Sequence, residues 1–374
     1  MSNPLSPGAL YRHKLYARLA RFCLTLSYLL IMVVSFSSPL AAAIKKFSES
    51  SVIMITVYSV VFYAGYFVFL FGVTVYEEFW LPRRCAPDRP ARFLEWLAGI
   101  KSREIRRFGV FFLALQIMYL FIETYIATWW INVTVVAVLV DLGWFYRARL
   151  ARMFPHADEP CADTLLAQRL IRKAEFAGFD IQEVRWGKLP DEHALPRVLL
   201  FRQSGKTLLV LSKQLQSGYA AEEIEMLLTF EIARYYLGHT WKRLIIRIVR
   251  IAAVVGAAKF LLEQTSRAHG FATLFDIAGF PLLAAYFLIA GMSAFVIGNF
   301  FERVFQRRAD RYALIFTQNA EAFLSLMMRL SASPATELRP PAWAARTVLG
   351  TDPLWLRIQR ARDFAQNLTY GNRQ

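Results

Sequence analysis

The stretch Leu227–Thr240 reads LLTFEIARYYLGHT and lies in a helix that we expect to begin near Glu222. Its apolar residues recur at helical spacing, so one side of this helix is expected to face a core. Glu231, Arg234 and His239 lie in the same stretch. The fold around this helix, and the partners of these side chains, decide what the protein can do.

The composition indicates a membrane protein. The chain has 374 residues, of which 56% are hydrophobic, and its mean hydropathy is +0.34. Apolar runs of about 20 residues account for this, because a helix of that length crosses a bilayer. The net charge of +16 is typical of loops that flank membrane spans, where Lys and Arg collect. We therefore expect the lipid bilayer as a partner and expect no binding of nucleic acid.

About six transmembrane helices are predicted. The first follows a basic N-terminal stretch, and its full length favours a membrane span over a cleaved signal peptide. The predicted spans are Phe22–Ile44, Val52–Val75, Phe108–Tyr125, Trp129–Phe145, Leu244–Leu262 and Leu274–Phe300.

The basic residues also give an orientation. Arginine and lysine precede the first span and recur through the loop 76–107, whereas the loop after the third span has none. By the positive-inside rule, both termini, the loop 76–107 and the segment 146–243 are expected in the cytoplasm. The expected membrane is a bacterial inner membrane.

The segment 146–243 is predicted to be a small α+β domain. Helical spacing indicates a helix in 163–176, short apolar runs between turn residues indicate strands, and a longer helix over 222–242 ends the segment. The predicted strands are Ile181–Trp186, Arg197–Arg202 and Thr207–Leu211.

The chain is thus divided into four parts. We expect a four-span region with its basic loop, the α+β domain, two further spans and a C-terminal helical region. In that last region helical spacing continues through Met328, and a final helix follows Pro353. The corresponding ranges are 1–145, 146–243, 244–300 and 301–374.

The central helix resembles the gluzincin motif H-E-x-x-H-x-x-x-G-H. Glu231 stands at the general base of the motif, and His239 stands at its last position. Phe230 and Arg234 replace the two metal-binding histidines.

Over about residues 60 to 365 the chain also resembles the type I CAAX prenyl proteases, which are integral-membrane zinc metalloproteases. The segment 174–179 is similar to the family's A-x-x-A-G-F turn, and 350–354 is similar to its closing S-H-P. The family's third zinc ligand is the Glu of E-x-x-A-D-x-x-A, where this chain has Gln306 and keeps Asp310. Asp352 replaces the histidine of the closing motif. The resemblance implies a mainly helical membrane protein that encloses a chamber.

The three replacements do not suit zinc. Phenylalanine has no lone pair, arginine cannot be deprotonated in proteins, and an amide oxygen is not among the usual zinc ligands. Zinc is therefore predicted to be absent, with no other cofactor and no catalytic residue in its place.

Arg234 lies three residues after Glu231, so the two side chains can pair on one helix face. One hypothesis, which we favour, is that this pair and the Gln306 amide replace the metal as a cross-link between two helices. The alternative is a solvated pair left after the loss of an old function.

The degenerate site favours a pseudoprotease that binds or regulates a peptide, a lipidated peptide or a membrane partner. Two alternatives stay open. The chain can be an active enzyme, either a membrane metallopeptidase-like hydrolase with a non-standard site or an enzyme of different chemistry. It can also be a structural subunit of a membrane complex.

Overall fold

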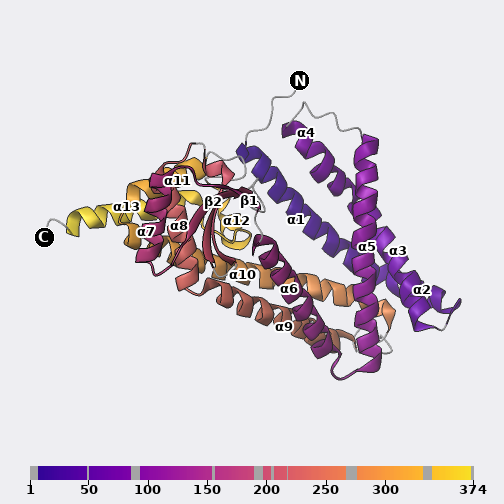
Figure 1. Cartoon of the computed structure of the whole chain (residues 1–374). Coiled ribbons are helices and arrows are strands. Elements are labelled where there is room, and N and C mark those ends of the chain that lie inside the picture. Colours follow the sequence, from indigo (N-terminus) through magenta and orange to yellow (C-terminus); the bar gives the residue numbers. More distant parts are fainter. Residues whose placement is uncertain are drawn as a thin grey trace. The chain divides into compact units, whose positions relative to one another are not determined.

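The computed structural model describes residues 7–48, 50–85, 93–153, 156–188, 197–203, 206–216, 218–266, 276–331 and 339–371. The chain forms two compact units, which are described in turn. Unit 1 comprises Met1–Val138 and Val249–Phe295, and unit 2 comprises Leu139–Ile248 and Val296–Gln374. Helices α6, α9 and α10 each contribute residues to both units (Figure 1).

Unit 1 is built from long helices. Helix α3 packs against α1 and against α5 (Figure 1). The Tyr58 ring of α3 is fully buried, and its hydroxyl lies 2.6 Å from the hydroxyl of Ser37. The elements are α1 (Pro7–Ile31), η1 (Met32–Phe36), α2 (Ser37–Lys45), α3 (Ser51–Val75), η2 (Tyr76–Trp80), α4 (Leu81–Cys85), α5 (Phe93–Thr124) and the start of α6 (Trp129–Met153).

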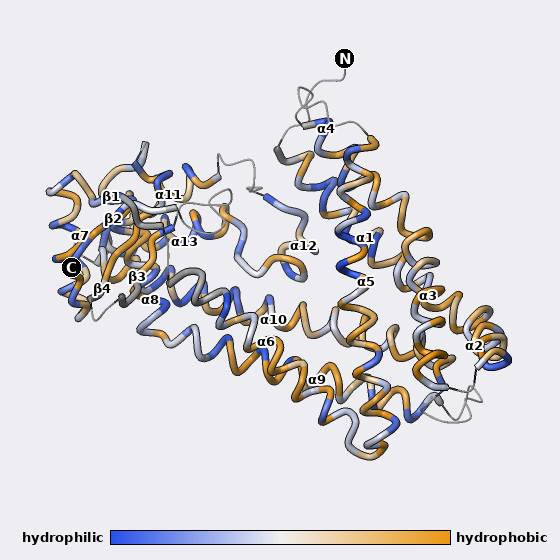
Figure 2. Tube along the Cα trace, turned by 45° about the vertical axis from the view of Figure 1, so that its right-hand side comes forward, coloured by the Kyte–Doolittle hydropathy of each residue, from blue (hydrophilic) through white to orange (hydrophobic). Residues whose placement is uncertain are grey.

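Five helical segments of the described chain are long and apolar enough to cross a membrane. Helix α3, for example, is coloured as hydrophobic along most of its length in Figure 2. The fifth predicted span, Leu244–Leu262, lies in α9 (His239–Ser266), which is not among the five. Its apolar positions are interrupted by Arg247, Arg250 and Lys259. The five segments are Ala9–Lys45, Ser51–Arg84, Phe93–Thr124, Trp129–Arg147 and Ile277–Thr317.

Unit 2 contains a four-stranded sheet in the order β1-β2-β4-β3. Strands β2 and β4 are parallel, while β1 pairs with β2 and β3 with β4 in antiparallel fashion. Three of the strands lie where the sequence predicts them, within a few residues. The strands are β1 (His156–Pro160), β2 (Glu183–Lys188), β3 (Val198–Gln203) and β4 (Lys206–Ser212).

One core of unit 2 lies between the sheet and two helices, α7 (Thr164–Phe176) and α8 (Ala221–Tyr236). Leu170 of α7, Leu209 of β4 and Ile232 of α8 have no exposed surface. The burial of one such side chain stabilises the fold by roughly 1.5–3 kcal/mol. This core holds α8 in place and fixes which of its residues face outward.

A second core joins α8 to the C-terminal helices. The predicted last helix is present as α13, and Leu354, Ile358 and Phe364 pack into this core. The predicted continuous helix through Met328 is interrupted at Gln318, whose φ is +50°. The remaining elements are η3 (Lys213–Leu215), η4 (Ile277–Gly279), α10 (Phe280–Thr317), α11 (Ala320–Ser331), α12 (Ala342–Thr347) and α13 (Leu354–Gly371).

Candidate functional site

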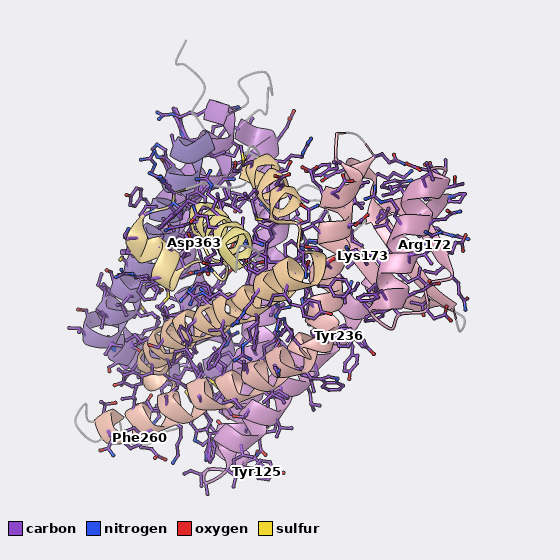
Figure 3. The ribbon with its side chains drawn as sticks, turned by 90° about the vertical axis from the view of Figure 1, so that its left-hand side faces the viewer. Tyr125, Arg172, Lys173, Tyr236, Phe260 and Asp363 are labelled. Carbon is purple, nitrogen blue, oxygen red and sulfur yellow. The ribbon has the colours of Figure 1, made fainter. Side chains whose placement is uncertain are left out.

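A buried carboxylate fixes the beginning of α8. Glu223 is 1% exposed and accepts a hydrogen bond from the backbone N–H of Ala220 at 2.9 Å. It also accepts one from the Ser325 hydroxyl at 2.6 Å and pairs with Arg329 of α11 at 3.2 Å. These contacts satisfy a free N–H at the helix terminus and attach α8 to α11. Figure 3 shows the other end of the helix at Tyr236.

Phe230 occupies an apolar site between helices. Its ring meets the ring of Phe323 edge to face, with the centroids 5.7 Å apart. The guanidinium of Arg357 lies 5.7 Å from the centroid of the Phe230 ring. The first metal-ligand position of the motif is therefore occupied by a side chain that packs against α11 and α13.

Glu231 and Arg234 form an ion pair within α8. The Arg234 Nη1 atom lies 3.0 Å from Glu231 Oε2, and the two side chains are 50% and 21% exposed, respectively. An exposed pair at this spacing stabilises a helix by about 0.3–0.5 kcal/mol. The hypothesis that this pair and the Gln306 amide cross-link two helices in place of the metal is wrong, because Arg234 faces solvent and Gln306 binds the backbone N–H of Asp352.

Gln306 of α10 holds the turn before α13. Its Oε1 atom accepts a hydrogen bond from the backbone N–H of Asp352 at 2.8 Å. The Asp352 carboxylate is 2% exposed and accepts two hydrogen bonds from Arg307, at 2.7 and 3.1 Å, and one from Arg360 at 2.6 Å. Burial alone would raise the pKa of Asp352, but the hydrogen bonds from the two arginines outweigh it and lower this pKa.

Asp310 forms a second ion pair on α10, after that of Arg307 with Asp352. Arg357 of α13 donates to both Asp310 oxygens, at 2.8 and 2.7 Å. The Arg357 and Asp310 side chains are 12% and 10% exposed. This bidentate geometry is the strong form of the interaction, and here it joins two helices. The pair links α10 to α13, whereas the link that we expected from Glu231, Arg234 and Gln306 was between α8 and α10.

Two more α10 residues bind backbone carbonyls at the end of α12. Asn299 Nδ2 donates to the carbonyls of Thr347 and Val348, each at 2.9 Å. Arg303 donates to the carbonyls of Leu349 at 2.6 Å and Arg346 at 2.8 Å. Sequence reasoning missed both residues, although polar residues spaced three or four apart in an apolar helix were the available signal. We call the resulting row the polar row of α10; it comprises Asn299, Arg303, Gln306, Arg307 and Asp310.

His239 is the first residue of α9 and is 1% exposed. Its ring stacks on Phe305 of α10 with the centroids 4.8 Å apart. Burial, together with the nearby cations, Arg243 first among them, lowers its pKa to about 4. The imidazole is therefore neutral at neutral pH and serves as a packing group between α9 and α10.

These side chains do not fit a zinc ion. The Phe230 ring packs on a neighbouring ring, the Arg234 guanidinium is charged, and the Gln306 oxygen is hydrogen-bonded to Asp352. Among the described residues, no group of three or more His, Cys, Asp or Glu side chains is arranged to hold a metal ion. Glu231, the position of the motif's general base, pairs with an arginine instead.

Part of the chain is similar in sequence to a known protein family. Residues 201–365 match the model of peptidase family M48. The chain is thus similar to the M48 peptidases, and the matched region contains α8, the polar row of α10 and α13. No curated protein matches the chain.

The fold is similar to that of Ste24p from S. mikatae, whose crystal structure is known. The TM-score is 0.57 at 14% sequence identity, and the match covers 87% of this chain and 80% of Ste24p. The predicted resemblance to the membrane CAAX proteases is thereby confirmed for the fold. The chain is an integral-membrane, M48-like protein, mainly helical with a small sheet.

Proposed function

We propose that this protein is a pseudoprotease, which binds or regulates a peptide, a lipidated peptide or a membrane partner without zinc-dependent hydrolysis. The observation that carries the proposal is the contact of Gln306 with the Asp352 backbone N–H. Gln306 stands at the third ligand position of the M48-like motif. Its side chain thus holds the turn before α13 and does not bind a metal.

The chemistry of hydrolysis supports the same proposal. A zinc peptidase needs a metal that polarises water and a carboxylate that accepts its proton. Glu231 lies beside Arg234, whose positive charge does not replace a Lewis acid. With Phe230 and Gln306 engaged elsewhere, Glu231 has no polarised water to deprotonate.

The similarity of the fold to that of Ste24p supports a binding role. The polar row keeps α10 attached to α12 and α13 through hydrogen bonds and ion pairs, so this scaffold does not depend on a metal for its stability. A protein that keeps such a scaffold without the catalytic ligands can still bind the kind of ligand that the scaffold accommodates. The partner classes follow from the resemblance to CAAX proteases.

The proposal includes a location. We place the protein in a bacterial inner membrane with both termini and the segment 146–243 in the cytoplasm. The basic residues of the loop 76–107 support this orientation by the positive-inside rule.

Elemental analysis of the purified full-length protein tests the loss of zinc. We expect far less than one zinc per chain, because the three ligand positions offer no suitable donor set. The triple variant F230H/R234H/Q306E restores the motif and should gain zinc, while the double variant F230H/R234H is its matched control. About one zinc per wild-type chain, retained under mild chelation, would refute the proposal.

A peptide assay separates binding from catalysis. A photoreactive farnesylated peptide should crosslink to the wild-type protein and be recovered intact, and the same peptide without the lipid should crosslink less. Cleavage by the wild-type protein, abolished in E231Q, would favour the active-enzyme alternative. Failure of both peptides to crosslink, together with a stoichiometric co-purifying protein, would favour the structural-subunit alternative.

A further inference from the structure

Helices α6 and α9 contact one another within unit 2. Arg247 of α9 pairs with Asp141 of α6 and lies 5.7 Å from the centroid of the Phe145 ring. These contacts fix the register between the two helices. Helix α6 enters unit 2 at Leu139, and α9 leaves it at Ile248, so the two helices run in opposite directions.

This register brings Arg147 and Trp241 to one level. Arg147 lies six residues after Asp141, and Trp241 lies six residues before Arg247. Six helical residues span about 9 Å, so both side chains lie the same distance beyond the Arg247–Asp141 pair.

Large apolar side chains are exposed around this level. Trp144 is 65% exposed, Tyr146 is 51% exposed and Trp241 is 67% exposed. In water such exposure is unfavourable, whereas Trp and Tyr are enriched where hydrocarbon meets lipid headgroups. Ile245, one turn after Trp241, is 58% exposed and extends the apolar surface along α9.

Two cations at the same level are oriented toward groups other than carboxylates. The Arg147 guanidinium lies 5.8 Å from the centroid of the Trp144 ring. Lys242 donates to the backbone carbonyl of Leu237 at 2.7 Å. In contrast, Arg243 pairs with Glu302 at 2.8 Å, so a protein carboxylate offsets its charge. The charges of Arg147 and Lys242 are thus available to an external anion.

From this combination we infer that Trp144, Tyr146, Arg147, Trp241 and Lys242 form a collar that binds the headgroups of anionic phospholipids. The aromatic rings lie at the headgroup level, and the two cations bind lipid phosphate. An acidic peptide would suit the cations, but it would leave the exposed tryptophans and Ile245 in water. The collar also fixes the depth of unit 2, because its level marks one surface of the bilayer. This inference does not depend on the proposed pseudoprotease function.

Titration of the purified full-length protein in detergent tests the charges of the collar. Dihexanoyl phosphatidylglycerol should bind more tightly than dihexanoyl phosphatidylcholine, as measured by tryptophan fluorescence. In R147Q/K242Q the apparent affinity for phosphatidylglycerol should fall by roughly fivefold for each cation, so about 25-fold in total. The matched control R172Q/R362Q removes two exposed arginines from α7 and α13 and should bind like the wild type; Arg172 is labelled in Figure 3.

Three outcomes of this titration would overturn the inference. They are equal affinity for the two lipids, an equal loss in both double variants, and binding of glycerol 3-phosphate as tight as that of phosphatidylglycerol. The last result would indicate a site for free phosphate.

Quenching by brominated phosphatidylglycerol in nanodiscs tests the position of the rings independently of the charges. The quenched part of the emission should fall in W144F/W241F. It should not fall in the matched control W343F/W355F, whose tryptophans lie on α12 and α13, outside the candidate spans. Both variants keep an aromatic ring, and near-UV circular dichroism checks that each is folded. Unchanged quenching in folded W144F/W241F would contradict the placement of the collar in the headgroup region.

Discussion

The ion pair between Asp310 and Arg357 should be the strongest polar link between α10 and α13. Its partners are 10% and 12% exposed, and both Asp310 oxygens accept hydrogen bonds. Asp310→Asn removes one charge with little change of shape, and Arg357→Met keeps much of the apolar stem. Each change strands the opposite charge in a buried site, which costs roughly 3–5 kcal/mol.

The pair in α8 provides a matched comparison within the same unit. Glu231→Gln and Arg234→Met alter an exposed pair of the same chemical type, which contributes about 0.3–0.5 kcal/mol. At about 2–4 °C per kcal/mol, the buried pair should lower the melting temperature by roughly 6–20 °C. The exposed pair should change it by about 2 °C or less.

The assay is thermal unfolding of detergent-purified protein, followed by circular dichroism for each single variant and for the double variant of each pair. D310N/R357M should be less destabilised than the sum of its single changes, because it strands no charge. Effects of equal size for the buried and the exposed pair would refute the claim that Asp310 and Arg357 form the strongest polar link between α10 and α13. Additive effects at Asp310 and Arg357 would refute it as well.

Protonation of His239 in the unfolded state should destabilise the fold as the pH drops from about 6.5 to 4, because burial lowers its folded pKa to about 4. The loss should reach roughly 3 kcal/mol and be smaller in H239Q; identical pH profiles of unfolding for wild type and H239Q would contradict this. In a cysteine-free background, a membrane-impermeant thiol reagent added outside cells should label K46C but not D363C, and labelling of D363C would overturn the proposed orientation. Phe230→Ala should destabilise the protein by roughly 2–4 kcal/mol through a cavity beside Phe323; a change below about 1 kcal/mol in denaturant unfolding would show that this contact is not a packed one.

Much of the fold could be predicted because it depends on local patterns. Apolar runs of span length, strands bounded by turn residues and the stripe of α8 are all visible in the sequence. Strand β1 was missed because HADEP has neither alternation nor a β-branched residue, and it forms only through pairing with β2. The break at Gln318 was missed because a side chain with positive φ at that position has no sequence signature, although Asn319 caps the next helix through the N–H of Ala322 at 2.9 Å.

The span predicted at Leu244–Leu262 shows a different limit of prediction from sequence. Helix α9 is present over this range, but its three cations exceed what the composition of a simple span allows. Two of them have carboxylate partners, of which only the one four residues away follows from helical spacing. Arg247 pairs with Asp141, which is 106 residues away, and Lys259 pairs with Glu263 at 2.8 Å. The cost of a charge in an apolar helix depends on such partners, so hydropathy alone does not decide whether α9 spans the membrane.

For the candidate site, the sequence located the altered positions but not their contacts. The register of the motif alone shows which residues replace the expected ligands. Where each side chain points depends on tertiary packing, so the choice of Arg234 as the bridging cation was wrong. Spacing favoured it, because Arg234 is Glu231's neighbour on one helix, whereas Arg357 is 47 residues from Asp310.

The distribution of charge around the site suggests how such a scaffold stays folded without a metal. A bound dication offsets nearby carboxylates, and its loss leaves buried negative charge unless another cation compensates. In this chain each carboxylate has a guanidinium: Asp310 has Arg357, and Asp352 has Arg307 and Arg360. A guanidinium binds a carboxylate through two directed hydrogen bonds, which fixes the angle between helices as well as the charge balance. Restoring the ligands at Phe230, Arg234 and Gln306 would therefore bring a dication close to arginines that already compensate the carboxylates. Zinc affinity in the rebuilt triple variant should consequently increase further when Arg307 is also changed to Met, and an unchanged affinity would show that the arginines do not oppose the metal.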